Sequence, residues 1–80
     1  RKLWIDFGEQ LGRRQSSAQI TELYRKEDLL GRHVIAVTNL PPKRVAGFRS
    51  EVLVLGVPDE DGRIVLLAPE RQTPLGARVY

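Results

Sequence analysis

Short apolar runs separated by turn residues are the feature that most limits the fold of this chain. Val34–Val37, Val52–Leu55 and Ile64–Leu67 are aliphatic and rich in β-branched residues, which favours strands. Pro, Gly and Asn stand between these runs, and Pro cannot donate to a hydrogen-bonded ladder. The pattern predicts an all-β, or mainly β, protein: a small barrel or sandwich.

The individual strands follow from alternation and from the turn residues. Strands are expected over residues 2–7, 10–15, 33–38, 51–56 and 63–68, with a turn and a short strand in 73–80. Gly8-Glu9 is expected at the tip of a first hairpin, and the acidic residues 58–62 at the tip of a second. The basic residues 43–50 are expected to form a loop.

One short helix is expected between the strands. Ile20, Leu23 and Tyr24 stand at i, i+3 and i+4, which predicts a helix over 18–24 that ends near Arg25-Lys26. Asp28 is then expected to cap a single further turn closed by Gly31.

Small size and the lack of crosslinks limit how the fold is stabilised. The 80 residues leave room for one domain, 1–80, whose core is marginal. With no Cys and one His, disulfides, thiol nucleophiles and multi-His metal centres are excluded. The lack of Met and a start within a strand suggest a fragment. We therefore expect stabilisation by a second copy or by further chain.

Positive charge is concentrated in the first part of the chain. Residues 1–49 hold ten Lys and Arg against five acids, whereas residues 50–80 hold three against five. Such segregation favours an anionic partner such as nucleic acid, although basic groups on a small domain are also its ordinary solvated surface.

The sequence shows no catalytic or membrane-spanning pattern. His33 has no evident partner, and Asp59-Glu60-Asp61 are explained as solvated charges of a turn. No glycine-rich phosphate loop is present, and no apolar run reaches 18 residues. We therefore expect no enzyme, cofactor, metal, small-molecule substrate or membrane insertion, and a cytoplasmic location.

The basic segment around Phe48 is the most suggestive candidate binding site. Lys43, Arg44 and Arg49 offer donors for phosphates, and Arg can also stack on a base. Alternatively, Phe48 plugs one end of the fold and the cations only solubilise the loop. Arg13 and Arg14 lie on opposite faces of their strand, so at most one of them, Arg14 in our assignment, serves a given groove.

Uncharged polar residues form a second candidate group: Gln15, Ser16, Ser17, Gln19, Asn39 and Ser50. Amides and hydroxyls of this kind can read base edges or bind an extended peptide backbone. The alternatives are helix capping by Ser16 or Ser17 and a bond from Asn39 to its own turn.

Several apolar side chains exceed what so small a core can hold. They are Trp4, Leu11, Tyr24, Leu40, Phe48 and Tyr80. We expect some of them at an interface, where aromatic rings can anchor a protein or stack on bases.

Residues 39–50, NLPPKRVAGFRS, resemble the signature of the tRNA-binding domains appended to methionyl-tRNA synthetases and of related stand-alone dimers. Where those domains continue with Gln or Glu, Gly and Met, this chain has EVLVLG at 51–56. In this departure, and in residues 5–8 and 15–21, the chain resembles the CsaA branch of the family, which consists of small bacterial secretion chaperones. The likeness covers essentially the whole chain.

The resemblance implies an OB-fold, a five-stranded Greek-key barrel with a short helix, whose first strand is missing before Arg1. It also implies a two-fold homodimer that binds unfolded preproteins and peptides and retains tRNA-binding character. The expected function is therefore a non-enzymatic, export-related chaperone. A tRNA-binding protein acting in trans, or the tRNA-binding domain of a methionyl-tRNA synthetase, are the alternatives.

Overall fold

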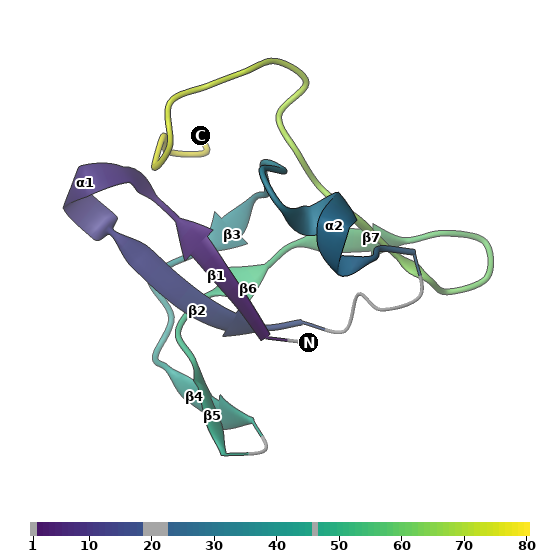
Figure 1. Cartoon of the computed structure of the whole chain (residues 1–80), viewed down its shortest axis with the longest axis horizontal. Helices are drawn as coiled ribbons and strands as arrows, with labels where there is room; N and C mark the ends of the chain where they lie inside the picture. Colours follow the sequence, from purple (N-terminus) through teal and green to yellow (C-terminus); the bar gives the residue numbers. More distant parts are fainter. Residues whose placement is uncertain (1, 19–22, 46) are drawn as a thin grey trace.

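A computed structural model describes residues 2–18, 23–45 and 47–80 as a mainly β fold with little helix (Figure 1). The mainly β prediction is confirmed. The elements are β1 (Lys2–Asp6), α1 (Gly8–Leu11), β2 (Arg13–Ser17), α2 (Lys26–Leu29), β3 (Ala36–Val37), β4 (Lys43–Val45), β5 (Phe48–Ser50), β6 (Leu53–Val54), β7 (Gly56–Pro58) and β8 (Ile64–Leu66).

The first hairpin forms as predicted, but its tip differs. β1 and β2 are antiparallel, from Lys2 opposite Ser17 to Asp6 opposite Arg13. Gly8 has φ +86°, and its N–H donates to the Asp6 carboxylate at 2.9 Å. This geometry starts the single turn of α1, so the return strand begins at Arg13 and the expected strand over 10–15 is corrected.

The helical prediction is only partly testable, because residues 19–22 lie outside the described residues. Leu23 to Arg25 are not helical, so the prediction of a helix ending near Arg25-Lys26 is corrected: α2 begins at Lys26. Asp28 lies inside this turn and accepts a hydrogen bond from the Arg25 N–H at 2.9 Å. Asp28 was expected to cap the turn from the position before it. It lies instead in the third position of the turn, and its carboxylate accepts the N–H of the residue that precedes the turn.

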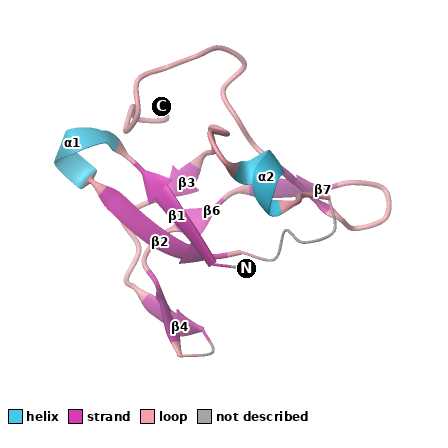
Figure 2. Cartoon of the chain, in the orientation of Figure 1, coloured by secondary structure: helices cyan, strands magenta, loops and turns pink. Residues whose placement is uncertain are grey.

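Residues 51–58 connect the separate two-stranded ladders (Figure 2). The Glu51 N–H donates to Gln15 O at 2.9 Å, and β6 pairs with β3. The Leu55 N–H donates to Ile35 O at 2.9 Å, while Leu55 O accepts from the Leu67 N–H at 3.1 Å. The expected strand over 51–56 is therefore divided between β6 and β7, and regular pairing in 33–38 is limited to β3.

The basic segment is a hairpin and not the expected loop. β4 and β5 pair from Lys43 opposite Ser50 to Val45 opposite Phe48. Gly47, with φ +79°, supplies a left-handed turn residue at the tip. The ladder fixes the directions of the basic side chains, and the hairpin projects from one end of the molecule (Figure 1).

The second predicted hairpin, across 58–62, is confirmed. β7 pairs with β8, and the Asp59 carboxylate accepts bonds from the backbone N–H groups of Asp61 and Arg63 and from the Arg63 guanidinium, each at 2.9 Å. Desolvation alone would raise the pKa of Asp59, but these bonds and the Arg63 charge outweigh it and hold that pKa below its ordinary value.

The described part of the chain encloses a very small core. Its buried apolar side chains are Val52 and Leu66, 5% and 8% exposed. The Tyr24 hydroxyl accepts a bond from the Leu66 N–H at 3.0 Å and ties the segment before α2 to β8. The accessible surface is 6506 Å², whereas a folded chain of 9.1 kDa is expected to expose about 4,900 Å².

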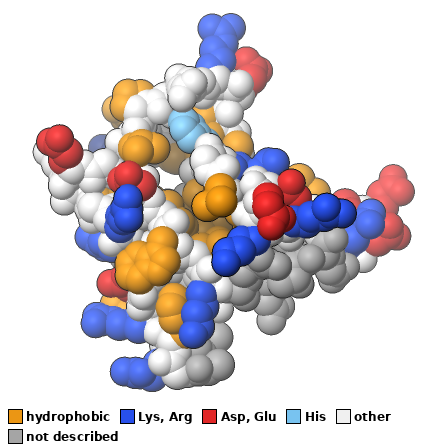
Figure 3. Space-filling model, in the orientation of Figure 1, with side chains coloured by type: hydrophobic (Ala, Val, Ile, Leu, Met, Phe, Trp, Pro, Cys, Tyr) orange, Lys and Arg blue, Asp and Glu red, His pale blue; other side chains and the backbone are white. Residues whose placement is uncertain are grey.

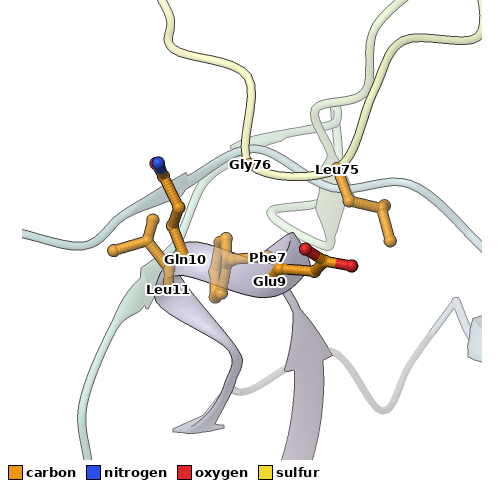
Figure 4. A pocket seen from close by; sticks show the side chains of 6 residues that line it. All are labelled: Phe7, Glu9, Gln10, Leu11, Leu75 and Gly76. Atoms are coloured by element: carbon orange, nitrogen blue, oxygen red, sulfur yellow. The ribbon is translucent and has the colours of Figure 1, made fainter.

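The C-terminal segment contains a turn at Leu75-Gly76 but no strand in the part that the structure describes, which corrects the strand expected in 73–80. It crosses α1 closely: a Cβ on Gly76 would overlap Phe7 O, and one on Gly8 would lie 2.9 Å from Leu75 O. A hollow of about 210 Å³ lies between them, lined by Phe7, Glu9, Gln10, Leu11, Leu75 and Gly76 (Figure 4).

Candidate functional site

Three cations lie on the hairpin of residues 43–50, which we call the basic hairpin. Lys43, Arg44 and Arg49 are exposed, and Arg44 is directly opposite Arg49 in the ladder. Like charges in directly opposed positions repel each other. None of the three forms an ion pair within the described residues. A bound anion would therefore relieve this repulsion.

Phe48 is half-buried beneath a fourth cation. The Lys2 ammonium group lies 5.2 Å from the centroid of the Phe48 ring, a cation–π contact between β1 and the basic hairpin. This contact occupies part of the ring surface that was expected to be available for stacking. It also brings the positive charge of Lys2 beside the cations of the basic hairpin.

Gln15 and Glu51 hold the basic hairpin against β2. The Gln15 side-chain amide donates to Arg49 O at 2.7 Å, and the Glu51 carboxylate accepts the Gln15 N–H at 3.1 Å. The Gln15 side-chain nitrogen and one Glu51 carboxylate oxygen are thus engaged within the protein. Their contribution in this structure is to position Arg49.

Three serines add further hydrogen bonds between β2 and the segment that contains β5 and Val52: Ser16, Ser17 and Ser50. The Ser16 side chain is 0% exposed and its hydroxyl donates to Val52 O at 3.0 Å. The Ser50 hydroxyl accepts the Ser17 N–H at 3.1 Å and donates to Val52 O at 3.3 Å. Ser16 and Ser17 belong to strand β2, so they are not at a helix start in the described part of the chain.

Replacing Ser50 by Ala tests this positioning role. The change removes the acceptor of the half-buried Ser17 N–H, so the free energy of unfolding should fall by about 1–2 kcal/mol. Urea denaturation measures this loss, and Ser50→Thr, which keeps a hydroxyl, should recover most of it. An Ala variant as stable as the Thr variant would show that the bond contributes nothing.

The remaining candidates are more dispersed. Arg13 is exposed and Arg14 half-buried, with the Arg14 Nε donating to Leu11 O at 3.1 Å, consistent with opposite faces. Asn39 lies in an exposed bend before the basic hairpin. Gln19 lies outside the described residues.

Lys2 was missed as a candidate, whereas Trp4 was among the apolar residues of which some were expected at an interface. Trp4 is 69% exposed and lies opposite Gln15, so both project from the same face of the β1–β2 ladder. Lys2, two residues before Trp4, shares this face. Alternation over residues 2–7 carried this signal. Of the six apolar residues of which some were expected at an interface, Trp4, Leu11, Leu40 and Tyr80 are exposed, whereas Tyr24 and Phe48 are half-buried.

Figure 3 shows how charged and hydrophobic side chains are distributed over one face of the molecule. Lys and Arg side chains gather over the basic hairpin, beside hydrophobic side chains over β1 and β2. Acidic side chains lie over α1, over α2 and at the β7–β8 end, with Lys and Arg side chains beside several of them. In the described residues no group of three His, Cys, Asp or Glu could hold a metal ion. No described helix is long and apolar enough to cross a membrane.

Residues 1–78 match the family described as "Putative tRNA binding domain". The chain belongs to this tRNA-binding domain family. The methionine–tRNA ligase of Thermococcus kodakarensis is 36% identical to this tRNA-binding domain over 75 residues, which are 94% of the chain and 10% of the ligase. The methionine–tRNA ligase of Archaeoglobus fulgidus is 38% identical over 78 residues, which are 98% of the chain and 11% of the ligase. The chain thus spans about a tenth of the length of the curated relatives that it matches.

Solved structures point to the CsaA branch. The CsaA chaperone of Bacillus anthracis has a TM-score of 0.92 and 57% identity, with 99% of this tRNA-binding domain and 74% of that chain covered. The CsaA chaperone protein of Picrophilus torridus has a TM-score of 0.90 and 48% identity, with 99% and 71% covered. The resemblance stated from residues 39–56 is confirmed.

Proposed function

We propose that this domain belongs to a non-enzymatic, homodimeric CsaA-type chaperone that binds tRNA and unfolded preproteins in the cytoplasm. The observation that carries the RNA part is the set of exposed cations on the basic hairpin, which hydrogen bonds to β2 hold in place. Arg guanidinium groups match phosphate geometry with two parallel donors, and Lys adds a mobile charge.

The proposed RNA site has contacting and positioning members. Lys43, Arg44 and Arg49 would contact phosphates, with Arg14 and Asn39 at the margin of the site. Five further residues, one beneath Lys2 and four on or near β2, would shape and position it: Phe48, Gln15, Ser16, Ser17 and Ser50. Gln19 completes the set as a proposed contact from the segment after β2.

Homodimer formation is supported by the excess of exposed surface. The chain exposes about 1,600 Å² more than a folded protein of its mass. A further strand and one side of an obligate interface, for which each partner buries about 1,000–2,500 Å², would together account for an excess of this size. Within the described residues β1 pairs with β2 alone, which leaves a strand edge. We further propose that residues 1–80 are one domain and that a further strand at an open edge completes a five-stranded OB-fold barrel.

Preprotein binding would use the exposed apolar side chains that the dimer leaves uncovered. An extended segment could contact these side chains and bond to a strand edge, as in β-strand addition. Two linked sites in a dimer would raise the avidity for a long unfolded chain without demanding a particular sequence.

Salt dependence tests the two binding modes separately. Between 50 and 200 mM salt, three phosphate contacts should cost tRNA about tenfold or more in affinity, because counterions are released on binding. Binding of an unfolded preprotein through apolar contacts should change by less than about twofold. Fluorescence anisotropy with both labelled ligands measures this. Tight tRNA binding without preprotein binding would reject the chaperone proposal.

A tRNA-binding protein acting in trans is the second candidate function, and the basic hairpin favours it directly. It would show the steep tRNA salt slope without preprotein affinity. A tRNA-binding domain of a methionyl-tRNA synthetase is distinguished by the sequence of the complete protein, since a synthetase carries a catalytic domain.

A further inference from the structure

We propose that Trp4 is a stacking platform for one unpaired nucleobase of the RNA whose phosphates the basic hairpin binds. This inference rests on the proposed RNA binding and names the part of the RNA that the site prefers. Nothing in the sequence predicted a role for Lys2, and Trp4 stood only among six apolar residues of which some were expected at an interface with an unnamed partner.

Strand pairing holds the backbone of Trp4, but most of its side chain is exposed. Trp4 lies in the middle of β1 and pairs with Gln15, so the ladder fixes its backbone. Its side chain is nevertheless 69% exposed, while the neighbouring Leu3 and Ile5 turn inward and are half-buried. An exposed indole on a paired strand contributes little to folding and offers a large flat surface.

The surroundings of the ring favour a nucleotide over an apolar peptide. Lys2 lies about 7 Å from Trp4 along the same face of the strand. The Gln15 side chain, opposite Trp4, bonds to Arg49 of the basic hairpin at 2.7 Å. A polyanion that follows the cations from the basic hairpin to Lys2 would therefore pass beside the indole.

The acidic groups near this path are already engaged. Asp6, on the same face as Trp4, accepts the Gly8 N–H and lies opposite Arg13. Glu51 accepts the Gln15 N–H. Their bonds reduce, without cancelling, the repulsion that these two carboxylates exert on phosphate.

Stacking requires a base whose face is accessible. In a duplex both faces of each internal base are covered by its neighbours, whereas loops and ends splay bases that can stack on aromatic rings. Every base has such a face, so the platform would tolerate different sequences. The preferred ligand is thus RNA with unpaired nucleotides beside its phosphates.

Trp4 itself reports on the interaction, because it is the single tryptophan of the 80 residues. The test uses the full-length protein, in which any tryptophan outside these 80 residues is replaced by Phe. This protein is titrated with a single-stranded oligoadenylate and with a blunt RNA duplex of equal length. The single strand should quench Trp4 emission in parallel with binding followed by anisotropy of labelled RNA. The duplex should bind without comparable quenching.

Substitutions separate stacking from folding. Trp4→Ala should weaken single-strand binding by about tenfold or more and leave duplex binding within about twofold. Trp4→Phe, which keeps an aromatic ring, should retain most of the single-strand affinity. Leu75→Ala, at another exposed apolar position, should change neither. Thermal unfolding verifies that all variants are folded, as expected for exposed side chains.

Each outcome decides the proposal. Single-strand binding without quenching, or with unchanged affinity in Trp4→Ala, would overturn the platform while leaving the proposed RNA binding intact. Failure of every RNA to bind at low salt would overturn both. A Trp4→Ala variant that alters dimer mass or preprotein binding, but not RNA binding, would assign the ring to a protein interface.

Discussion

Replacing Lys43 and Arg44 together by Ala is expected to lower tRNA affinity by about tenfold or more at physiological salt. Both side chains are exposed on β4, and neither forms an ion pair in the described parts of the chain. Their loss should therefore remove phosphate contacts without leaving a buried charge. The slope of log affinity against log salt should become shallower by about 1.5–2, because two counterions fewer are released.

The matched control removes the same charge elsewhere. Arg71 and Arg78 lie on the exposed C-terminal segment, so Arg71→Ala with Arg78→Ala lowers the net charge equally. If tRNA is bound at the basic hairpin, this control should retain most of the affinity. An equal loss in the two double variants would indicate that only overall charge matters. Light scattering should show the same molecular mass for both.

Leu66→Ala is expected to have the largest effect on stability. Leu66 is 8% exposed and is one of two buried apolar side chains in the described structure. Truncation of a buried Leu costs about 2–5 kcal/mol, as lost burial and as a cavity. In a domain of this size that loss lowers Tm by about 10 °C or more, which circular dichroism measures.

The adjacent residue provides the control for this variant. Leu67 follows Leu66 but is exposed, so Leu67→Ala should cost less than about 1 kcal/mol. Comparable losses in the two variants would contradict the core assignment. They would instead indicate that Leu67 is buried in an interface between two copies of the chain, which a dependence of Tm on protein concentration would reveal.

The β1–β2 and β7–β8 hairpins were predictable because the sequence patterns that indicate them are local. Alternation over residues 2–7 and the turn residues at 58–62 specify pairing partners that lie close in sequence. The basic segment was expected to be a loop because its cations and Gly47 resemble loop composition. It pairs because Gly47 closes a turn that brings Val45 opposite Phe48.

The roles of the polar residues could not be obtained in this way. Gln15, Ser16 and Ser50 are residue types typical of a binding site, but each forms a hydrogen bond with a partner 33 to 36 residues away along the chain. Composition states which hydrogen bonds a side chain can form, and tertiary contacts decide which ones it does form. The structure also decides that Trp4 is exposed. Its place in a predicted strand did not decide this, because a Trp in a strand can lie in a core as well as at the surface.

The sequence by itself determined the mainly β class, the two local hairpins, the segregation of charge and the family, because each depends on residue order over short spans. The tertiary structure alone decided that residues 51–58 connect the ladders and that a polar cluster fastens the basic hairpin to β2. It also decided that Lys2 lies over Phe48 while Trp4 remains in solvent. These features depend on contacts between residues that are far apart in the sequence. Such contacts form, and stabilise the protein, only when the chain has folded.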